Sequence, residues 1–142
     1  MLRVTDIMTP GAITINMDDR LQHVRYLFDL HKFHHLLMVD SHNKLMGVLS
    51  DRDLLKALSP NLGKASETTK DIATLNKRAH MVASRKPVTV KESDSLSTAV
   101  ETFFDSQVSC LPVIDDNNSP VGIITMRDII RILHNTARAK GH

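Results

Sequence analysis

The chain repeats itself at an offset of 75 residues. Residues 36–58 read LLMVDSHNKLMGVLSDRDLLKAL, and residues 111–133 read LPVIDDNNSPVGIITMRDIIRIL, with no gap between the copies. Extended backwards, the match pairs residues 4–58 with 79–133 and contains 11 identities in 55 positions. Two copies of one unit can stack about a pseudo-twofold axis, so that any groove between them is lined twice by corresponding residues. The repeat therefore favours a duplicated architecture with a paired binding site.

Both copies are predicted to contain the same elements in the order β-α-β-β-α. A short strand precedes an amphipathic helix, two strands form a hairpin around a polar turn, and a second helix follows. Asp18 or Asp19 can cap the first helix of the first copy, and a residue of the segment 93–95 can cap the first helix of the second copy. The predicted elements are residues 12–15, 21–32, 36–39, 45–49 and 51–58 in the first copy, and 88–90, 96–106, 111–114, 121–125 and 127–134 in the second.

The fold class predicted from this order is α+β, with the two repeats packed as one pseudo-twofold module. A linker rich in small polar residues, SPNLGKASETTK, separates the copies. It leads into a predicted connecting helix at residues 71–79, and Thr68 and Asp71 have the spacing of a capping box at its start. The predicted division of the chain is residues 1–58 (first repeat), 59–78 (linker), 79–134 (second repeat) and 135–142 (polar tail).

Composition narrows the class of protein. The 142 residues are 42% hydrophobic but only 4% aromatic, which predicts an aliphatic core. Lys and Arg number 18 against 16 Asp and Glu, without a long basic run, so nucleic-acid binding has little support. A single cysteine, Cys110, fits a reducing compartment. No stretch approaches the ~20 apolar residues of a membrane span, and the N-terminus lacks a signal-peptide pattern, so we expect a soluble cytoplasmic protein without a membrane association.

Two sequence elements of each copy resemble the cystathionine-β-synthase (CBS) domain. They are the apolar strand that ends in Asp, LLMVD or LPVID, and the element GVLSDRD or GIITMRD that opens the closing helix. Their occurrence twice in register makes the resemblance specific, and it covers all but the linker and tail. The linker is also similar to small stand-alone CBS-pair proteins of the acetoin-utilisation type. The resemblance implies a Bateman module that binds AMP, ADP, ATP or S-adenosylmethionine and acts in regulatory signal transduction.

The residues of the second element suit a nucleotide. Ser50 and Asp53, like Thr125 and Asp128, lie where a strand becomes a helix, beside free backbone N–H groups. From there a carboxylate can accept hydrogen bonds from a ribose diol, and a hydroxyl can contact a phosphate. The same spacing is an ordinary capping box, which is the alternative interpretation of both pairs. The duplicated context favours ligand contact for Asp128 in particular.

By resemblance, each binding site draws on both repeats. The ligand-binding residues of the Asp128 site would be Ile123, Thr125, Arg127, Asp128, Ser109 and Cys110, with Gly11, Ile13, Phe33 and His34 from the first repeat. Those of the Asp53 site would be Val48, Ser50, Asp53, His34 and His35, with Lys86, Val88, Val108 and Ser109 from the second. Arg85 and Lys86 replace Pro10 and Gly11, so we expect the Asp53 site to prefer a ligand with more phosphates.

Three histidines, His31, His34 and His35, invite a metal interpretation, since His31 and His35 have i, i+4 spacing. The second copy has no comparable set, and the preferred interpretation is that His34 and His35 line the groove and make ligand binding sensitive to pH. Cys110 lacks the flanking motif of a nucleophile and is expected to be a buried or groove-lining thiol. No phosphate-binding glycine loop, G-x-S-x-G or H-E-x-x-H motif occurs, so neither catalysis nor a required cofactor or metal is predicted.

The leading functional prediction is a regulatory module that senses an adenosine nucleotide and passes its state to a partner. The partner would be an unidentified effector enzyme or transporter, or a second copy of the chain in a homodimer formed through the helices. The alternative is an interaction or scaffold protein that does not bind nucleotides. The start at Met1 and the polar tail favour a stand-alone chain.

Overall fold

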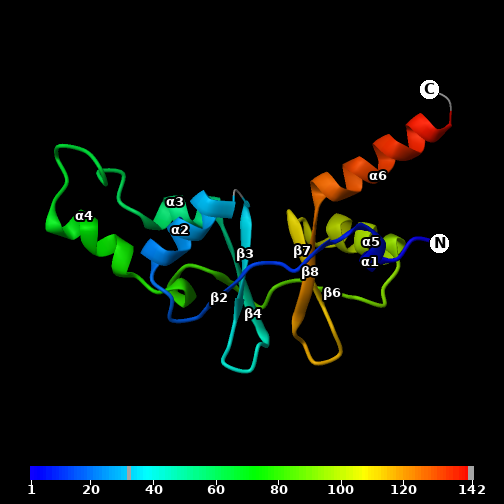
Figure 1. Cartoon of the computed structure of the whole chain (residues 1–142), viewed down its shortest axis with the longest axis horizontal. Helices are drawn as coiled ribbons and strands as arrows, with labels where there is room; N and C mark the ends of the chain where they lie inside the picture. Colours follow the sequence, from blue (N-terminus) through cyan, green and yellow to red (C-terminus); the bar gives the residue numbers. More distant parts are fainter. Residues whose placement is uncertain (32, 141–142) are drawn as a thin grey trace. The chain divides into compact units, whose positions relative to one another are not determined.

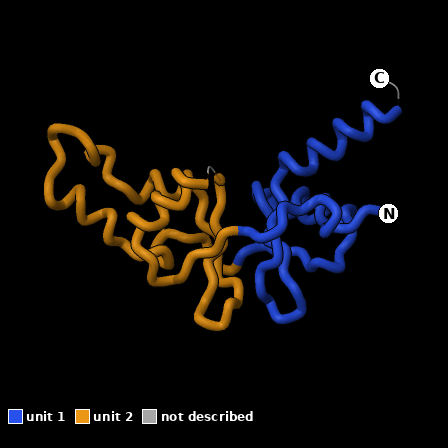
Figure 2. The backbone as a smooth tube through the Cα atoms, in the orientation of Figure 1, with its two compact units in different colours: residues 1–12, 87–142 blue, residues 13–86 orange. Residues whose placement is uncertain are grey.

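The computed structural model describes residues 1–31 and 33–140 and divides them into two compact units. The first, which we call unit 1, contains residues 1–12 and 87–142, and the second, unit 2, contains residues 13–86 (Figure 2). The units therefore do not follow the sequence repeats at their edges. The first residues of each repeat, 1–12 and 79–86, belong to the unit that contains the rest of the other repeat.

Unit 2 is built on a four-stranded sheet in the order β2-β3-β4-β5. Figure 1 labels its strands β2, β3 and β4. Strand β2 is parallel to β3, which forms an antiparallel hairpin with β4, and β5 closes the edge. Two helices, α2 and α3, follow β2 and β4. The bounds are β2 Thr14–Asn16, α2 Leu21–His31, β3 His35–Val39, β4 Leu45–Ser50, α3 Asp51–Ala57, α4 Thr69–Ala73, the 3-10 helices η1 Thr74–Asn76 and η2 Ala79–Met81, and β5 Ser84–Arg85.

Unit 1 repeats this sheet in the order β6-β7-β8-β1, with the same parallel and antiparallel pairings. Helix α6 continues directly from β8, and its far end extends away from the sheet of its own unit (Figure 1). The bounds are α1 Val4–Ile7, β1 Thr9–Pro10, β6 Val90–Lys91, α5 Leu96–Ser106, β7 Cys110–Ile114, β8 Pro120–Thr125 and α6 Met126–Ala139. The mixed α+β class and the duplication predicted from the sequence are confirmed.

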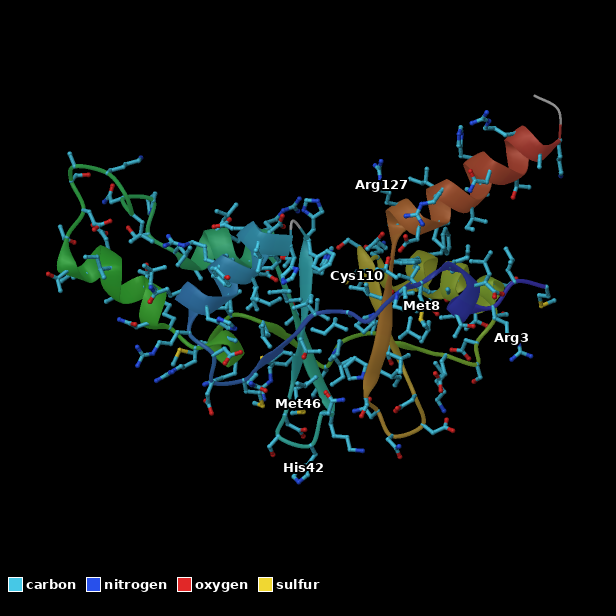
Figure 3. All side chains as sticks on the ribbon, viewed as in Figure 1. Arg3, Met8, His42, Met46, Cys110 and Arg127 are labelled. Carbon is cyan, nitrogen blue, oxygen red and sulfur yellow. The ribbon has the colours of Figure 1, made fainter. Side chains whose placement is uncertain are left out.

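The two hairpins agree residue by residue. His35 pairs with Ser50 across β3 and β4, and Cys110 pairs with Thr125 at the corresponding place in β7 and β8. Each turn begins with an aspartate whose Oδ1 accepts two backbone N–H groups, as Asp40 does from His42 and Lys44 at 2.8 and 3.0 Å. These bonds lower the pKa of the Asp40 carboxyl, and the Lys44 N–H has the largest effect. Figure 3 shows His42 at the tip of its hairpin.

One glycine in each sheet lets a two-residue strand approach the hairpin. A Cβ on Gly47 would lie 2.5 Å from the carbonyl oxygen of Ser84 in β5. A Cβ on Gly122 would lie 2.8 Å from the carbonyl oxygen of Thr9 in β1 and 2.6 Å from the sulfur of Met8. Both distances are far below ordinary carbon–oxygen contact, so the pairings of β4 with β5 and of β8 with β1 require glycine.

Each unit has its own cluster of buried apolar side chains. In unit 2 the cluster lies between the sheet and helices α2 and α3, and in unit 1 it involves α1, α5 and the sheet. The apolar periodicity of the sequence predicted the inward face of α2, where Leu21, Val24 and Phe28 are buried. No helix among residues 1–31 and 33–140 is long and apolar enough to cross a membrane.

Several predicted elements differ from the structure at their ends. The predicted connecting helix 71–79 is broken: α4 ends at Ala73, a 3-10 turn follows, and Lys77 is extended. The extended Lys77 lets its carbonyl accept the N–H of Leu21 at the start of α2. The expected cap of α2 by Asp18 or Asp19 is therefore wrong, and Asp19 instead accepts the N–H of Asn16 at 2.8 Å.

The remaining differences are shifts of strand and helix ends. The two short strands begin two residues later than predicted, at Thr14 and Val90, and α6 runs to Ala139 rather than to residue 134. The predicted helix 96–106 is confirmed at both ends, with Ser95 as its cap. The capping box of Thr68 and Asp71 is also confirmed. The last residue of the predicted helix 21–32, Lys32, lies outside the described residues.

The close approach at Gly47 predicts a specific loss of stability. Replacing Gly47 with alanine should lower the free energy of unfolding by about 1–3 kcal/mol, because backbone rather than a flexible side chain opposes the new methyl group. Urea denaturation measures this difference. The comparison variant is Gly63→Ala, where nothing lies within 4 Å of the place that the new methyl group would take and only the positive φ of 77° opposes alanine. A loss at Gly47 no larger than that at Gly63 would contradict the account of the strand crossing.

Candidate functional site

The two carboxylates singled out from the sequence both close capping boxes. The N–H of Ser50 donates to Asp53 Oδ2 at 3.0 Å, and the N–H of Asp53 donates back to Ser50 Oγ at 3.0 Å. In the second copy, Thr125 N–H donates to Asp128 Oδ2 at 2.8 Å, and Asp128 N–H donates to Thr125 Oγ1 at 3.4 Å. The capping interpretation is thus confirmed at both places, and it fixes each carboxylate at the end of a hairpin strand.

The two carboxylates differ in their second oxygen. Asp128 Oδ1 accepts a hydrogen bond from Arg131 Nη2 at 2.8 Å, an ion pair one turn along α6. The Asp128 residue is only 2% exposed, whereas Asp53 is half-buried. Lys56 occupies the position of Arg131 in the first copy, and no described residue donates a hydrogen bond to Asp53 Oδ1.

A shallow hollow of about 410 Å³ lies beside Asp53 within unit 2. The ammonium-bearing side chains of Lys56 and Lys77 line it together with the apolar side chains of three further residues. Lys77 Nζ also donates to the carbonyl oxygen of Ala57 at 3.2 Å, which holds the lysine at the end of α3. Besides Asp53, the lining residues are Lys56, Ala57, Lys77, Met81 and Val82.

Gly11 and Lys86 occupy corresponding places directly after β1 and β5, and both have left-handed backbone. Their φ angles are 65° and 57°. A glycine adopts this conformation without strain, whereas a lysine does so at a cost of roughly 1 kcal/mol. Within unit 1, Gly11 N–H donates to the carbonyl oxygen of Val121 at 3.4 Å, so this turn follows the edge of β8. Both residues are exposed.

The histidines of the first copy make separate interactions. His34 Nδ1 lies 2.8 Å from Asp51 Oδ2, and both groups remain accessible to solvent. The ring of His31 stacks on that of Phe33 with centroids 5.6 Å apart. Burial lowers the pKa of His35, and this effect exceeds the opposing influence of the nearby Asp51 carboxylate. Among the residues that the structure describes, no three His, Cys, Asp or Glu side chains gather as a metal site.

Cys110 is a buried thiol at the first position of β7. It is 7% exposed, and this burial raises the pKa of the thiol to about 12. The thiol therefore stays protonated at neutral pH, in agreement with the absence of a nucleophile motif. Figure 3 shows Cys110 near the upper part of β7 and Arg127 at the start of α6. The Arg127 side chain is exposed.

The structure divides the predicted ligand-binding residues between the two units. Those with exposed or half-buried positions include Ile13, Val48 and Ile123, which lie in or beside the hairpins, and Val88 and Val108 in the segments around α5. Unit 1 contains Gly11, Val88, Val108, Ser109, Cys110, Ile123, Thr125, Arg127 and Asp128, and unit 2 contains Ile13, Phe33, His34, His35, Val48, Ser50, Asp53 and Lys86. The combination of residues from both units at one ligand stays a prediction.

Sequence reasoning missed two kinds of residue. Arg131 follows Asp128 by three positions, a spacing at which helix side chains meet, so its ion pair could have been predicted. Lys77 comes from the linker, 24 positions beyond Asp53, and no local pattern connects the two. It reaches the hollow because the break after η1 returns the chain to the start of α2.

Three solved structures of similar proteins match this fold over almost the whole chain. A protein of Vibrio cholerae named for acetoin utilization (AcuB) has a TM-score of 0.78 at 25% identity, covering 99% of this chain and 96% of that one. The CBS domain pair of protein MJ0100, in complex with 5′-methylthioadenosine and S-adenosyl-L-methionine, has a TM-score of 0.78 at 25% identity, covering 96% and 98%. The protein CBSX2, in complex with AMP, has a TM-score of 0.77 at 25% identity, covering 96% and 99%.

Curated relatives contain the same segment in different settings. An inosine-5′-monophosphate dehydrogenase of Methanocaldococcus jannaschii is 28% identical over 130 residues, which are 91% of this chain but 23% of that protein. A CBS domain-containing protein of Dictyostelium discoideum is 28% identical over 131 residues, which are 92% of this chain and 90% of that protein. The family model of the CBS domain matches residues 4–60 and 79–135. The chain therefore belongs to the CBS domain family, with one CBS domain in each sequence repeat.

Proposed function

We propose that the chain is a regulatory module that binds an adenosine nucleotide or S-adenosylmethionine. The observation that carries the proposal is the duplicated carboxylate of Asp53 and Asp128, each held by a capping box at the end of a hairpin strand. Two similar CBS pairs at 25% identity are complexes with adenosine-type ligands. In this proposal the ligand is a regulatory signal, and the module has no catalytic role of its own.

The binding residues proposed for this ligand are those predicted from the sequence, with contributions from both repeats. The ribose would be bound by a carboxylate, and the phosphates by hydroxyl and cationic groups. Lys56 and Lys77 add two cations near Asp53 to the residues predicted from the sequence. Together with Arg85 and Lys86, they favour a ligand of higher negative charge at the Asp53 site.

The output of the module is proposed to pass through its helices to a second copy of the chain. Unit 1 exposes large apolar side chains on two helices, with Phe104 of α5 at 83% and Leu133 of α6 at 65%. Two exposed acidic residues, Glu101 and Asp105, lie beside Phe104 on α5, whereas α6 carries exposed basic residues along its length. An apolar acidic helix and an apolar basic helix are complementary between two copies, which supports a homodimer.

Further parts of the proposal concern the cellular setting. The module would act in the cytoplasm and pass its ligand state to an effector enzyme or a transporter, without contact to nucleic acid. The alternative function is a CBS-pair scaffold that associates through the same helices and binds no nucleotide. A ligand screen separates the two functions, since a ligand at 100 times its Kd stabilises the folded state by ~2.7 kcal/mol.

Titration calorimetry with AMP and ATP tests the proposed binding. Wild type should bind both ligands. Asp53→Asn should weaken the binding of ATP more than the binding of AMP, because the cations near Asp53 favour additional phosphates. Asp128→Asn is the matched variant in the second copy, and it should weaken AMP at least as much as ATP. Equal losses for both ligands in both variants would contradict the unequal sites. No binding of AMP, ADP, ATP, S-adenosylmethionine or NAD would favour the scaffold function.

Sedimentation equilibrium tests the proposed dimer. Wild type should be dimeric at micromolar concentration, and Ile130→Glu should shift it toward monomer, because Ile130 is 60% exposed on the apolar face of α6. Asn135→Glu adds the same charge to an exposed position on the opposite side of that helix and should leave the dimer intact. A monomeric wild type, or equal effects of the two substitutions, would refute the assignment.

A further inference from the structure

The two carboxylates have different capacities left for a ligand. A carboxylate can accept about four hydrogen bonds, and a ribose diol donates two. Asp128 already accepts three, from Thr125 N–H at 2.8 Å, Thr125 Oγ1 at 3.2 Å and Arg131 Nη2 at 2.8 Å. Asp53 accepts one from the described residues, the N–H of Ser50 at 3.0 Å. A diol can therefore bind Asp53 without displacing a side chain, whereas at Asp128 it must displace one.

The displaced group at Asp128 would be the Arg131 guanidinium. The Thr125 bonds belong to the capping box and hold the start of α6, so their loss would disturb the helix. The Arg131 side chain is 55% exposed and can move into solvent without disturbing the fold. Its charge-assisted bond nevertheless has to be broken before both ribose hydroxyls can reach the carboxylate.

We propose that Arg131 is a specificity-determining residue that closes the Asp128 carboxylate to a nucleoside, so that the Asp53 carboxylate binds the nucleoside first. The proposal rests on the proposed nucleotide binding and names the order in which the two sites fill. Arg131 acts through Asp128 and is therefore a positioning residue.

The first copy shows why its carboxylate stays open. Lys56 stands where the second copy has Arg131. Within the described part of the chain, its ammonium group makes no ion pair with Asp53. A lysine is a flexible, strongly hydrated point charge, whereas the planar guanidinium fork of arginine suits a carboxylate. Asp53 and Lys56 both line the open hollow in unit 2, so a ligand reaching this carboxylate meets free space and two cations. The presence of lysine in the first copy and arginine in the second thus accounts for the open carboxylate of Asp53 and the occupied one of Asp128.

Calorimetry with adenosine tests the proposal, because adenosine carries the diol without a phosphate that would interact with Arg131 directly. In an Asp53→Asn background, which removes the first carboxylate, Arg131→Gln should strengthen adenosine binding by about tenfold, the effect of removing one charge-assisted bond. In the same background, the adenosine affinity of the Arg131→Lys variant should lie between the affinity with Arg131 and that of Arg131→Gln. In the wild-type background, Lys56→Arg should weaken adenosine binding at the first site.

Two controls separate this role from a structural one. Arg138→Gln removes an equal charge further along α6 and should leave adenosine binding unchanged. 2′-Deoxyadenosine lacks one hydroxyl of the diol and should gain much less from Arg131→Gln than adenosine does. Equal gains for both nucleosides would assign the effect to general loosening and overturn the proposal.

The possible failures point to different parts of the account. If wild type binds adenosine and Arg131→Gln brings no gain in the Asp53→Asn background, the role of Arg131 is refuted while the proposed function stands. If adenosine, AMP, ADP, ATP and S-adenosylmethionine all fail to bind wild type and every variant, the proposed function is refuted and this inference with it. Thermal unfolding of each variant without ligand verifies that the binding differences are measured on folded protein.

Discussion

The hydrogen bonds between a hydroxyl residue at the end of a strand and an aspartate in the first turn of the next helix determine the geometry of the candidate site. A helix start leaves backbone N–H groups without partners, and the hydroxyl of the capping box accepts one of them. The carboxylate in turn accepts the backbone N–H of the hydroxyl residue at the end of the strand. The carboxylate is therefore held at a defined place in both copies. Whether it then contacts a ligand depends on what its other oxygen already binds.

The sheets depend on a second constraint, the absence of a side chain at Gly47 and Gly122. Each glycine admits the backbone of a two-residue strand that comes from the beginning of the other repeat. The same crossing brings Gly11 and Lys86 to the edge of a sheet with left-handed backbone. The identity of these glycines in the sequence match thus has a structural reason.

Much of the fold could be predicted from the sequence, because the hairpins and α5 have strong local signals. Apolar runs, Asp-rich turns and a serine cap defined α5 to the residue and the hairpins to within one residue at each end. The strands β1 and β5 could not be predicted, since two residues carry no periodicity and their partners lie far along the chain. The break after α4 was missed because the partner of Lys77 is the distant N–H of Leu21.

The site was predicted in type but not in detail. The carboxylates and hydroxyls were visible because they recur in both copies, whereas the ion pair of Asp128 with Arg131 and the position of Lys77 depend on side-chain packing. In the proposed function, these differences between the copies make the two sites unequal. Two sites with the same scaffold and unequal carboxylates can fill at different ligand concentrations, which extends the range over which a module responds.

The central claim is that a nucleotide reaches the first repeat before the second. Amide NMR of the isotope-labelled wild-type chain during an ATP titration tests it most directly, since residues 50–53 and 125–128 report on the two carboxylates separately. The account predicts that signals of residues 50–53 shift and saturate at lower ATP concentration than those of residues 125–128. Simultaneous saturation of both sets, or a titration in which neither set shifts, would contradict it.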